Sequence, residues 1–316
     1  MPNGFLLIDK PVELRSAECV AQVKCMLSKK SKQGKKNELS RVGHAGTLDS
    51  TASGLLVLLL GSATRLSDYV MKLPKTYEAT MRLGAATDTC DASGQVIFRG
   101  DAESVSEQAF DRVLRSFWGM RMQRPPEISA LKIGGKPSHE IAREGQEISL
   151  ASRSVFMSSV RRCSPISCGS VRIAVVCGKG TYIRALVRDI GEALGCGAHV
   201  EELRRLSTGP FNVCEAYAPE AIANMSELSE KLRSPREIVS AFHRIILTED
   251  AERRLMNGLC VPLADAGRYV SGSGELRHGL CVEGVNMIGF ADINAVEGGA
   301  PVLKPRANIF MGELMS

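Results

Sequence analysis

The stretch RVGHAGTLDSTASGLLVLLLG, residues 41–61, decides how the fold is interpreted. It places a histidine, His44, and an aspartate, Asp49, five residues apart in a turn rich in glycine. A wholly apolar run, residues 55–60, follows at once, and its composition predicts a central strand that is covered on both sides. The turn therefore sets two ionisable side chains directly against the predicted core.

Composition limits the class of protein. With 316 residues, of which 44% are hydrophobic and 24% charged, the sequence is typical of a globular protein with one large and one smaller domain. The longest apolar run, six residues, is too short to span a membrane, and the N-terminal residues lack the basic region of a secretory signal. Ten cysteines without a C-x-x-C pair indicate reduced thiols and a cytoplasmic location.

The surrounding sequence predicts strands and helices in mixed order. Alternating or apolar segments predict strands, and apolar positions at helical spacing predict helices, the first of them capped by Ser16. The absence of a regular strand–helix–strand rhythm favours an α+β fold with a mixed sheet. The predicted strands are residues 4–9, 55–60, 76–84 and 170–178, and the predicted helices begin at Ser16 and cover about 106–117 and 181–194.

The pattern of predicted elements changes near residue 247. A short helix with Thr248 as its N-cap and Gly258 at its end is followed by short strands and glycine turns. About 70 residues of this kind suggest a small β-rich domain, for which a barrel is one suitable architecture. We therefore predict a large domain over 1–246 and a small one over 247–316.

Charge is concentrated in a few segments, within a modest net charge of +5. The run KKSKQGKK, residues 29–36, carries five lysines, and shorter basic clusters occur at VRRC, 160–163, and LRRL, 203–206. Each is compatible either with a solvated surface or with contacts to phosphate groups.

The sequence lacks the motifs of several catalytic and binding sites that the opening turn could otherwise form. The sequence has no G-x-x-x-x-G-K-[ST] phosphate loop, and Ser53 lacks the first glycine of a G-x-S-x-G nucleophile elbow. His44 and Asp49 have no third metal ligand nearby at a useful spacing. On spacing alone, Asp49 is best explained as the acceptor of an Asx turn or a helix cap.

Longer motifs carry a more specific signal. GHAGTLDSTASGLLVLLLGSATR, residues 43–65, closely resembles the G-H-x-G-T-L-D-P-x-A-x-G-x-L motif of the TruB-type tRNA pseudouridine synthases. The resemblance continues in collinear order over about residues 4–211, and the final segment resembles the small PUA-type domain of that family. The other matching segments are LLIDKP at 6–11, KTYEATMRLGAATDTCDASG at 75–94, QRPPEISALKIGGKPSHEIAREG at 123–145, and GKGTYIRALVRDIGEALGCGAHVEELRRLSTGPF at 178–211.

This resemblance implies a fold and a reaction. The fold is a largely antiparallel mixed sheet with flanking helices, an RNA-gripping insertion at about 123–152, and the small C-terminal domain. The reaction breaks the N1–C1′ bond of uridine 55 in the TΨC loop of tRNA, turns the base and joins C5 to C1′. Such an isomerisation needs no cofactor and no metal. The stand-alone bacterial type is expected, without an obligate protein partner and as a monomer.

The resemblance also assigns roles to residues. Asp49 matches the catalytic aspartate, which acts either as the nucleophile or by removing a sugar proton, and Arg184 matches the arginine that pairs with it. Tyr77 matches the tyrosine that stacks on the target base and helps to move the C5 proton. His44 matches the histidine that fills the space of the flipped base, and Tyr182 and Val200 match further pocket positions. The residues expected to contact RNA are Lys10, Arg41, Lys132, Lys136, Arg143 and Lys179.

Some positions depart from the pattern of the family. Ser50 replaces a proline after the aspartate, and Glu13 and Arg15 replace a glycine and a threonine in the first motif. Ile128 and His139 replace aromatic residues in the insertion. None of these is Asp49, Tyr77 or Arg184, so we expect an active enzyme with an altered grip on RNA. The alternative is a tRNA-folding chaperone in which isomerisation is secondary.

Overall fold

The computed structural model describes residues 3–29, 41–127, 132–133, 136–137, 150–272, 280–294 and 300–310. These residues form two compact units. The first unit comprises residues 1–48, 55–73 and 209–316, and the second comprises 49–54 and 74–208. No helix within the described ranges is long and apolar enough to cross a membrane.

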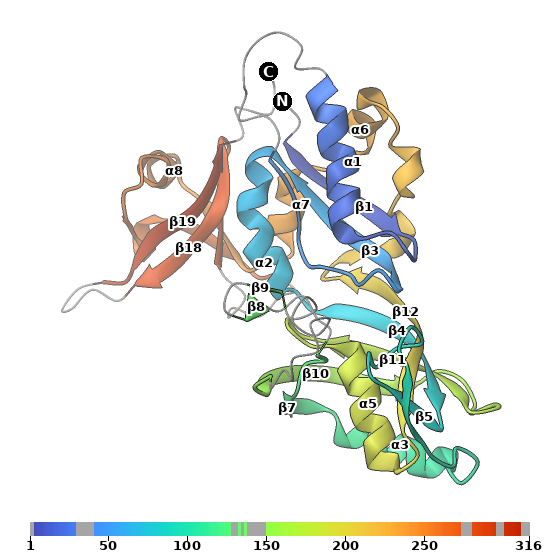
Figure 1. Ribbon diagram of the computed structural model, residues 1–316. Coiled ribbons are helices and arrows are strands. Elements are labelled where there is room, and N and C mark those ends of the chain that lie inside the picture. The colour runs from blue at the N-terminus through green and yellow to red at the C-terminus, as the bar shows by residue number, and fades with distance from the viewer. Residues whose placement is uncertain are drawn as a thin grey trace. The chain divides into compact units, whose positions relative to one another are not determined.

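The second unit is built on an antiparallel sheet of five strands (Figure 1). Their order is β12 (Ala198–Thr208), β4 (Lys75–Leu83), β11 (Ser170–Cys177), β10 (Arg153–Arg162) and β7 (Gly119–Gln123). Residues 52–54, at the start of β3 (Ala52–Leu60), pair in parallel with residues 203–205 of β12. This parallel contact makes the sheet mixed and attaches the chain that follows Asp49 to β12.

One face of this sheet is covered by helices. Every second residue of β4, beginning with Lys75, is buried, whereas the residues between them are partly exposed. The helix α5 (Ile183–Leu194) contacts β12 and β4, and α3 (Glu107–Ser116) packs against α5 and β10. The apolar stripe of α5 places Ala185, Leu186 and Ile190 in the core. The short strands β5 (Ala85–Thr87) and β6 (Val96–Arg99) form a separate hairpin.

The first unit contains strands β1 (Gly4–Lys10) and β2 (Val42–His44), which both pair with β3, and a six-stranded sheet. Residues of both sheets, among them Leu7, Leu55, Phe290 and Ile309, belong to one buried apolar cluster. The six-stranded sheet has the order β15 (Val261–Pro262), β19 (Val302–Phe310), β18 (Met287–Asn294), β17 (Leu280–Glu283), β14 (Arg244–Leu247) and β16 (Gly267–Val270). The helices are α1 (Ser16–Lys29), α2 (Ser67–Lys72), α6 (Met225–Lys231), α7 (Pro235–Ser240) and α8 (Glu249–Met256).

The predicted fold class is confirmed: the sheet is mixed and largely antiparallel, with flanking helices and a β-rich C-terminal part. Thr248 caps α8 as expected, since its side chain accepts a hydrogen bond from the Ala251 N–H. The sheet of the β-rich part already begins at β14, and the domain boundary at 246/247 stays a prediction.

The expected cap of the first helix is wrong. Ser16 is the first residue of α1, and its hydroxyl binds the backbone of Leu48 instead: it donates to the Leu48 carbonyl at 2.9 Å and accepts from the Leu48 N–H at 2.9 Å. A buried hydroxyl that makes both bonds fixes a backbone strongly. Ser16 therefore holds the residue immediately before Asp49.

Candidate active site

Asp49 lies in the turn that leads into β3. Its carbonyl accepts a hydrogen bond from the Ala52 N–H at 3.1 Å, and its side chain is 38% exposed. The turn is followed by Gly54, which has a φ of +105° and lies opposite Arg205 of β12. A Cβ atom at Gly54 would stand 2.2 Å from the Arg205 carbonyl oxygen, so only glycine allows this close approach. The backbone around Asp49 is thus pinned while its carboxylate stays accessible.

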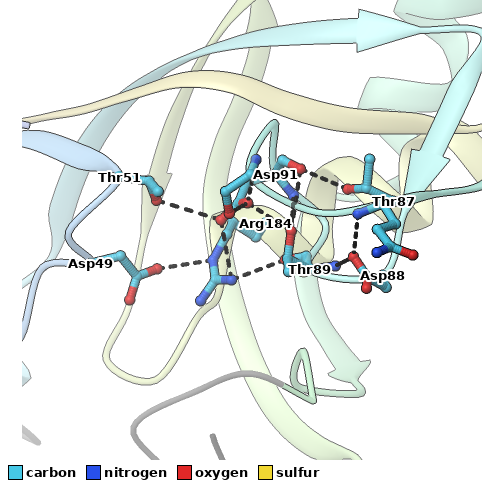
Figure 2. Close-up of polar contacts among 9 residues, drawn as sticks. Asp49, Thr51, Thr87, Asp88, Thr89, Asp91 and Arg184 are labelled. Atoms are coloured by element: carbon cyan, nitrogen blue, oxygen red, sulfur yellow. Dashed lines mark hydrogen bonds and ion pairs between the residues drawn. The ribbon is translucent and has the colours of Figure 1, made fainter. Parts of the chain in front are cut away.

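Arg184, in the first turn of α5, meets this carboxylate. Its Nε lies 2.9 Å from Oδ2 of Asp49, and its side chain is 7% exposed (Figure 2). The start of α5 is fixed by the buried Gln123, whose side chain accepts from the Tyr182 N–H at 2.9 Å and donates to the Tyr182 carbonyl at 3.1 Å. The fixed start of the helix therefore holds the Arg184 guanidinium next to Asp49 in one orientation.

A second carboxylate, that of Asp91, lies on the other side of the guanidinium. Nη1 of Arg184 is 3.4 Å from Oδ2 of Asp91 and donates to the Thr89 carbonyl at 2.9 Å (Figure 2). Asp91 also accepts hydrogen bonds from the hydroxyls of Thr89 at 2.7 Å and Thr51 at 3.4 Å. Because Thr51 belongs to the Asp49 turn, Asp91 joins that turn to Arg184.

Sequence reasoning did not single out Asp91. It occurs in TDTCDASG, a run of short polar residues typical of a turn, and the structure uses it as one: the Thr87 hydroxyl donates to the Asp91 carbonyl at 2.7 Å. The one available signal was the concentration of hydroxyl side chains around an acid. The consequence is an arginine shared by a buried carboxylate and a partly exposed one.

Tyr77 lies on the buried face of β4. Tyr77 is 9% exposed. Its hydroxyl is hydrogen-bonded to the side chain of Arg205, the residue opposite it on β12. Burial raises the pKa of Tyr77, the Arg205 guanidinium lowers it in part, and the negative charge of Asp49 adds a smaller rise. The structure therefore brings Tyr77 within electrostatic reach of Asp49. Arg205 is a further residue that sequence reasoning missed, since LRRL was interpreted only as a basic cluster.

Two other predicted pocket residues support neighbouring backbone. Val200 is buried, and its N–H donates to the Cys90 carbonyl at 3.0 Å while its carbonyl accepts from Ala92 at 2.9 Å, so it holds the loop that carries Asp91. The ring of Tyr182 lies under the guanidinium of Arg153, 4.7 Å from ring centroid to Cζ. Their contact with a flipped base stays a prediction.

The predicted RNA contacts differ in accessibility. Lys179, in the turn before α5, and Arg41, in the first unit, are exposed. Lys10 is wholly buried, and its Nζ donates to the carbonyls of Pro11 and Leu14, each at 2.7 Å. The ammonium of Lys10 thus closes a turn within the protein, and its contact with RNA stays a prediction. His44 ends β2 in the first unit, opposite Leu58.

Other predicted positions are described in part or not at all. Lys132 and Lys136 lie on β8 (Lys132–Ile133) and β9 (Lys136–Pro137), which pair antiparallel. Arg143, Ile128 and His139, and residues 30–36 of the lysine run, lie outside the described residues. Among the departures, Ser50 is exposed in its turn, and Glu13 has a φ of +68°. A glycine adopts that conformation without strain, so the glutamate introduces local strain there.

The arrangement is suited to chemistry at a carbon that develops positive charge. An accessible carboxylate is oriented by a buried guanidinium, and a buried tyrosine stands nearby. Among the described residues, no group of three or more histidine, cysteine, aspartate or glutamate side chains is placed to hold a metal ion.

Comparison with known proteins places the chain in a family. Residues 32–183 match the TruB family pseudouridylate synthase N-terminal domain, and residues 184–247 match the tRNA pseudouridylate synthase B C-terminal domain. The tRNA pseudouridine synthase B of Geobacter sulfurreducens is 39% identical over 260 residues, 81% of this chain and 82% of that protein. The enzyme of the same name from Burkholderia pseudomallei is 41% identical over 267 residues, 83% of this chain and 84% of that protein.

A solved structure shares the fold. The chain matches a structure described as a Cbf5-Nop10-Gar1 complex with a TM-score of 0.72 and 24% identity, covering 98% of this chain and 85% of the other. At this identity the likeness bears on the fold alone, whereas the curated relatives bear on the activity. The chain therefore belongs to the TruB family of pseudouridylate synthases, the isomerases that convert uridine to pseudouridine.

Proposed function

We propose that the chain isomerises the uridine at position 55 in the TΨC loop of tRNA, acting in the cytoplasm as a monomer without an obligate protein partner. The names of the relatives support tRNA as the substrate. The observation that carries the proposal is the ion pair of 2.9 Å between Asp49 and Arg184, at the end of a turn whose backbone is fixed on both sides.

The roles of the residues follow from this geometry. Cleavage of the N1–C1′ bond builds positive charge on the sugar, and the accessible carboxylate of Asp49 acts on it, as the nucleophile at C1′ or by taking a sugar proton. Arg184 orients that carboxylate, because its Nε contacts one carboxylate oxygen while its Nη1 contacts Asp91. Tyr77 forms a wall for the extruded base and accepts the C5 proton.

The test is an assay on an unmodified tRNA transcript with the purified protein alone. Pseudouridine is mapped by carbodiimide treatment and primer extension, for the wild type and for Asp49→Asn. The exposed Asp101, whose carboxylate accepts from the Glu103 N–H at 2.9 Å in the same unit, provides the matched control Asp101→Asn. We expect product at position 55 from the wild type and the control, and none from Asp49→Asn, which still binds tRNA within severalfold.

Three results would contradict the proposal. Product at another position would refute the assignment of the substrate site, and full activity of Asp49→Asn would refute its role. A wild type that binds and refolds tRNA without forming any product would favour the chaperone instead. Light scattering of the free protein at micromolar concentration gives its molar mass and so tests whether it is a monomer.

A further inference from the structure

Beneath Tyr77 the sheet carries polar side chains that the roles above do not use. Lys75 and Tyr77 are two residues apart on β4 and face the same buried side. Cys177 of β11 lies opposite Lys75, and Arg205 of β12 lies opposite Tyr77. Arg205 and Cys177 are each 2% exposed. Two cationic side chains and a thiol thus lie on the buried face that holds the tyrosine.

The position of Arg205 is fixed by both neighbouring strands. Its backbone lies opposite Tyr77 on one side and opposite Gly54 on the other, and the register of β12 shifts directly after it. Gly54 can approach the Arg205 backbone only because it lacks a Cβ. The backbone of Arg205 therefore pairs with the strand that follows the Asp49 turn. Its side chain contacts the Tyr77 hydroxyl.

The charged and titratable groups around the Tyr77 hydroxyl come from every strand that flanks it. Arg205 on β12 favours negative charge on the phenol oxygen, whereas Cys177 on β11 and Asp49 in the turn oppose it. On its own strand, Lys75 lies opposite Thr208 of β12, and burial together with the Arg205 charge lowers the pKa of Lys75 to about 7. The guanidinium is thus the group that counteracts the effect of burial on the tyrosine most strongly.

We propose that Arg205 is a positioning residue that orients the Tyr77 hydroxyl and stabilises the negative charge that its oxygen carries before it takes the proton from C5. The inference rests on the role of Tyr77 given above. In that step the C5–H bond breaks and its electron pair forms the C5=C6 double bond. The Tyr77 hydroxyl first releases its proton to solvent, and its oxygen then takes the proton from C5. The electron pair of the C6=N1 bond moves to N1, which takes a proton from solvent. The base therefore ends with the same number of protons.

The charge and the fork of Arg205 should matter separately. In Arg205→Met the hydroxyl loses both its donor and the nearby positive charge, and the rate of proton transfer should fall by about tenfold to hundredfold. Arg205→Lys keeps the charge and should recover part of that loss. The matched control is Arg172→Met, because Arg172 is 54% exposed on β11 of the same sheet and pairs with Glu78 at 3.8 Å.

The experiment uses tRNA transcribed with uridine that carries deuterium at C5, under single-turnover conditions with the full-length protein. We expect the wild type and the control to show little isotope effect, and both Tyr77→Phe and Arg205→Met to become slow and strongly isotope-sensitive. The double variant should be no slower than Tyr77→Phe, since both changes act on one step. Circular dichroism and the thermal midpoint of each variant show whether it is folded.

The outcomes separate the inference from the function on which it rests. If Arg205→Met is slow without an isotope effect while Tyr77→Phe shows one, Arg205 has a merely structural role and the inference is overturned. Should Tyr77→Phe react at the rate of the wild type, the assigned role of Tyr77 fails, and the inference fails with it. A wild type that forms no pseudouridine refutes the proposed function before either variant is measured.

Discussion

Replacing Lys75 by methionine should make the stability of the protein less dependent on pH. Lys75 is 7% exposed, and burial, helped by the positive charge of Arg205, lowers its pKa from 10.5 to about 7. Between these two values the unfolded chain binds a proton that the folded protein does not. The free energy of unfolding of the wild type therefore rises with pH from about 7 to 10.5. Below pH 7 both states are protonated and the full penalty of a buried charge is present.

The magnitude follows from the two pKa values. Each pH unit of difference is worth about 1.4 kcal/mol, so the buried ammonium destabilises the folded state by about 5 kcal/mol at pH 6 and about 2 kcal/mol at pH 9. Lys75→Met removes the titrating group and fills a similar volume. The gain in stability of the variant over the wild type should therefore shrink by about 3 kcal/mol between pH 6 and pH 9.

Urea unfolding at both pH values measures this difference. The single tryptophan, Trp118, reports on the correct unit, because its indole N–H donates to the Val160 carbonyl at 2.8 Å within the second unit. Lys304→Met, at an exposed lysine of β19, is the control and should leave the pH dependence unchanged. Parallel pH profiles for Lys75→Met and the wild type, with equal slopes of free energy against urea, would refute the reasoning.

Three further predictions concern the site and the RNA contacts. Asp91→Asn weakens the buried anchor of Arg184, so we expect the single-turnover rate to fall by about tenfold to hundredfold while tRNA affinity changes little; an unchanged rate at equal stability would show that Arg184 needs only Asp49. Lys179→Ala should reduce the slope of log affinity against log salt by about one, because one exposed cation no longer releases a counterion. Lys10→Met should lower the thermal midpoint and leave that slope unchanged, and a reduced slope would return the buried Lys10 to the RNA contacts.

Much of the fold could be predicted because its pattern is local. The apolar run 55–60 and the alternation of β4 carry their own periodicity, and the stripe of α5 does the same. The same local reasoning failed for Ser16, which a helix start predicts as a cap. Its hydroxyl instead binds Leu48, 32 positions away in the chain, and no local pattern indicates a contact of that range.

The site residues that could not be predicted from the sequence are buried polar residues. Asp91 lies among short polar residues that predict a solvated turn, yet it is 5% exposed. Arg205 follows another arginine, and a basic pair suggests a surface. The strand alternation was the missing information, because it places Arg205 on the same side as Leu203 and turns Arg204 to the other. Once β12 is recognised as a strand, a buried arginine is the direct consequence.

The charges of the second unit separate into two groups with different tasks. Around Arg184, two carboxylates share one guanidinium, and the more exposed of these side chains is Asp49, at 38% against 8% for Asp91. Asp91 and the Thr89 carbonyl hold the arginine from within, so the pair with Asp49 does not depend on bound RNA for its geometry. Around Tyr77 the arrangement is reversed, since the hydroxyl is hydrogen-bonded to the guanidinium of the buried Arg205. In the proposed mechanism, the accessible carboxylate acts at C1′ and the tyrosine acts at C5.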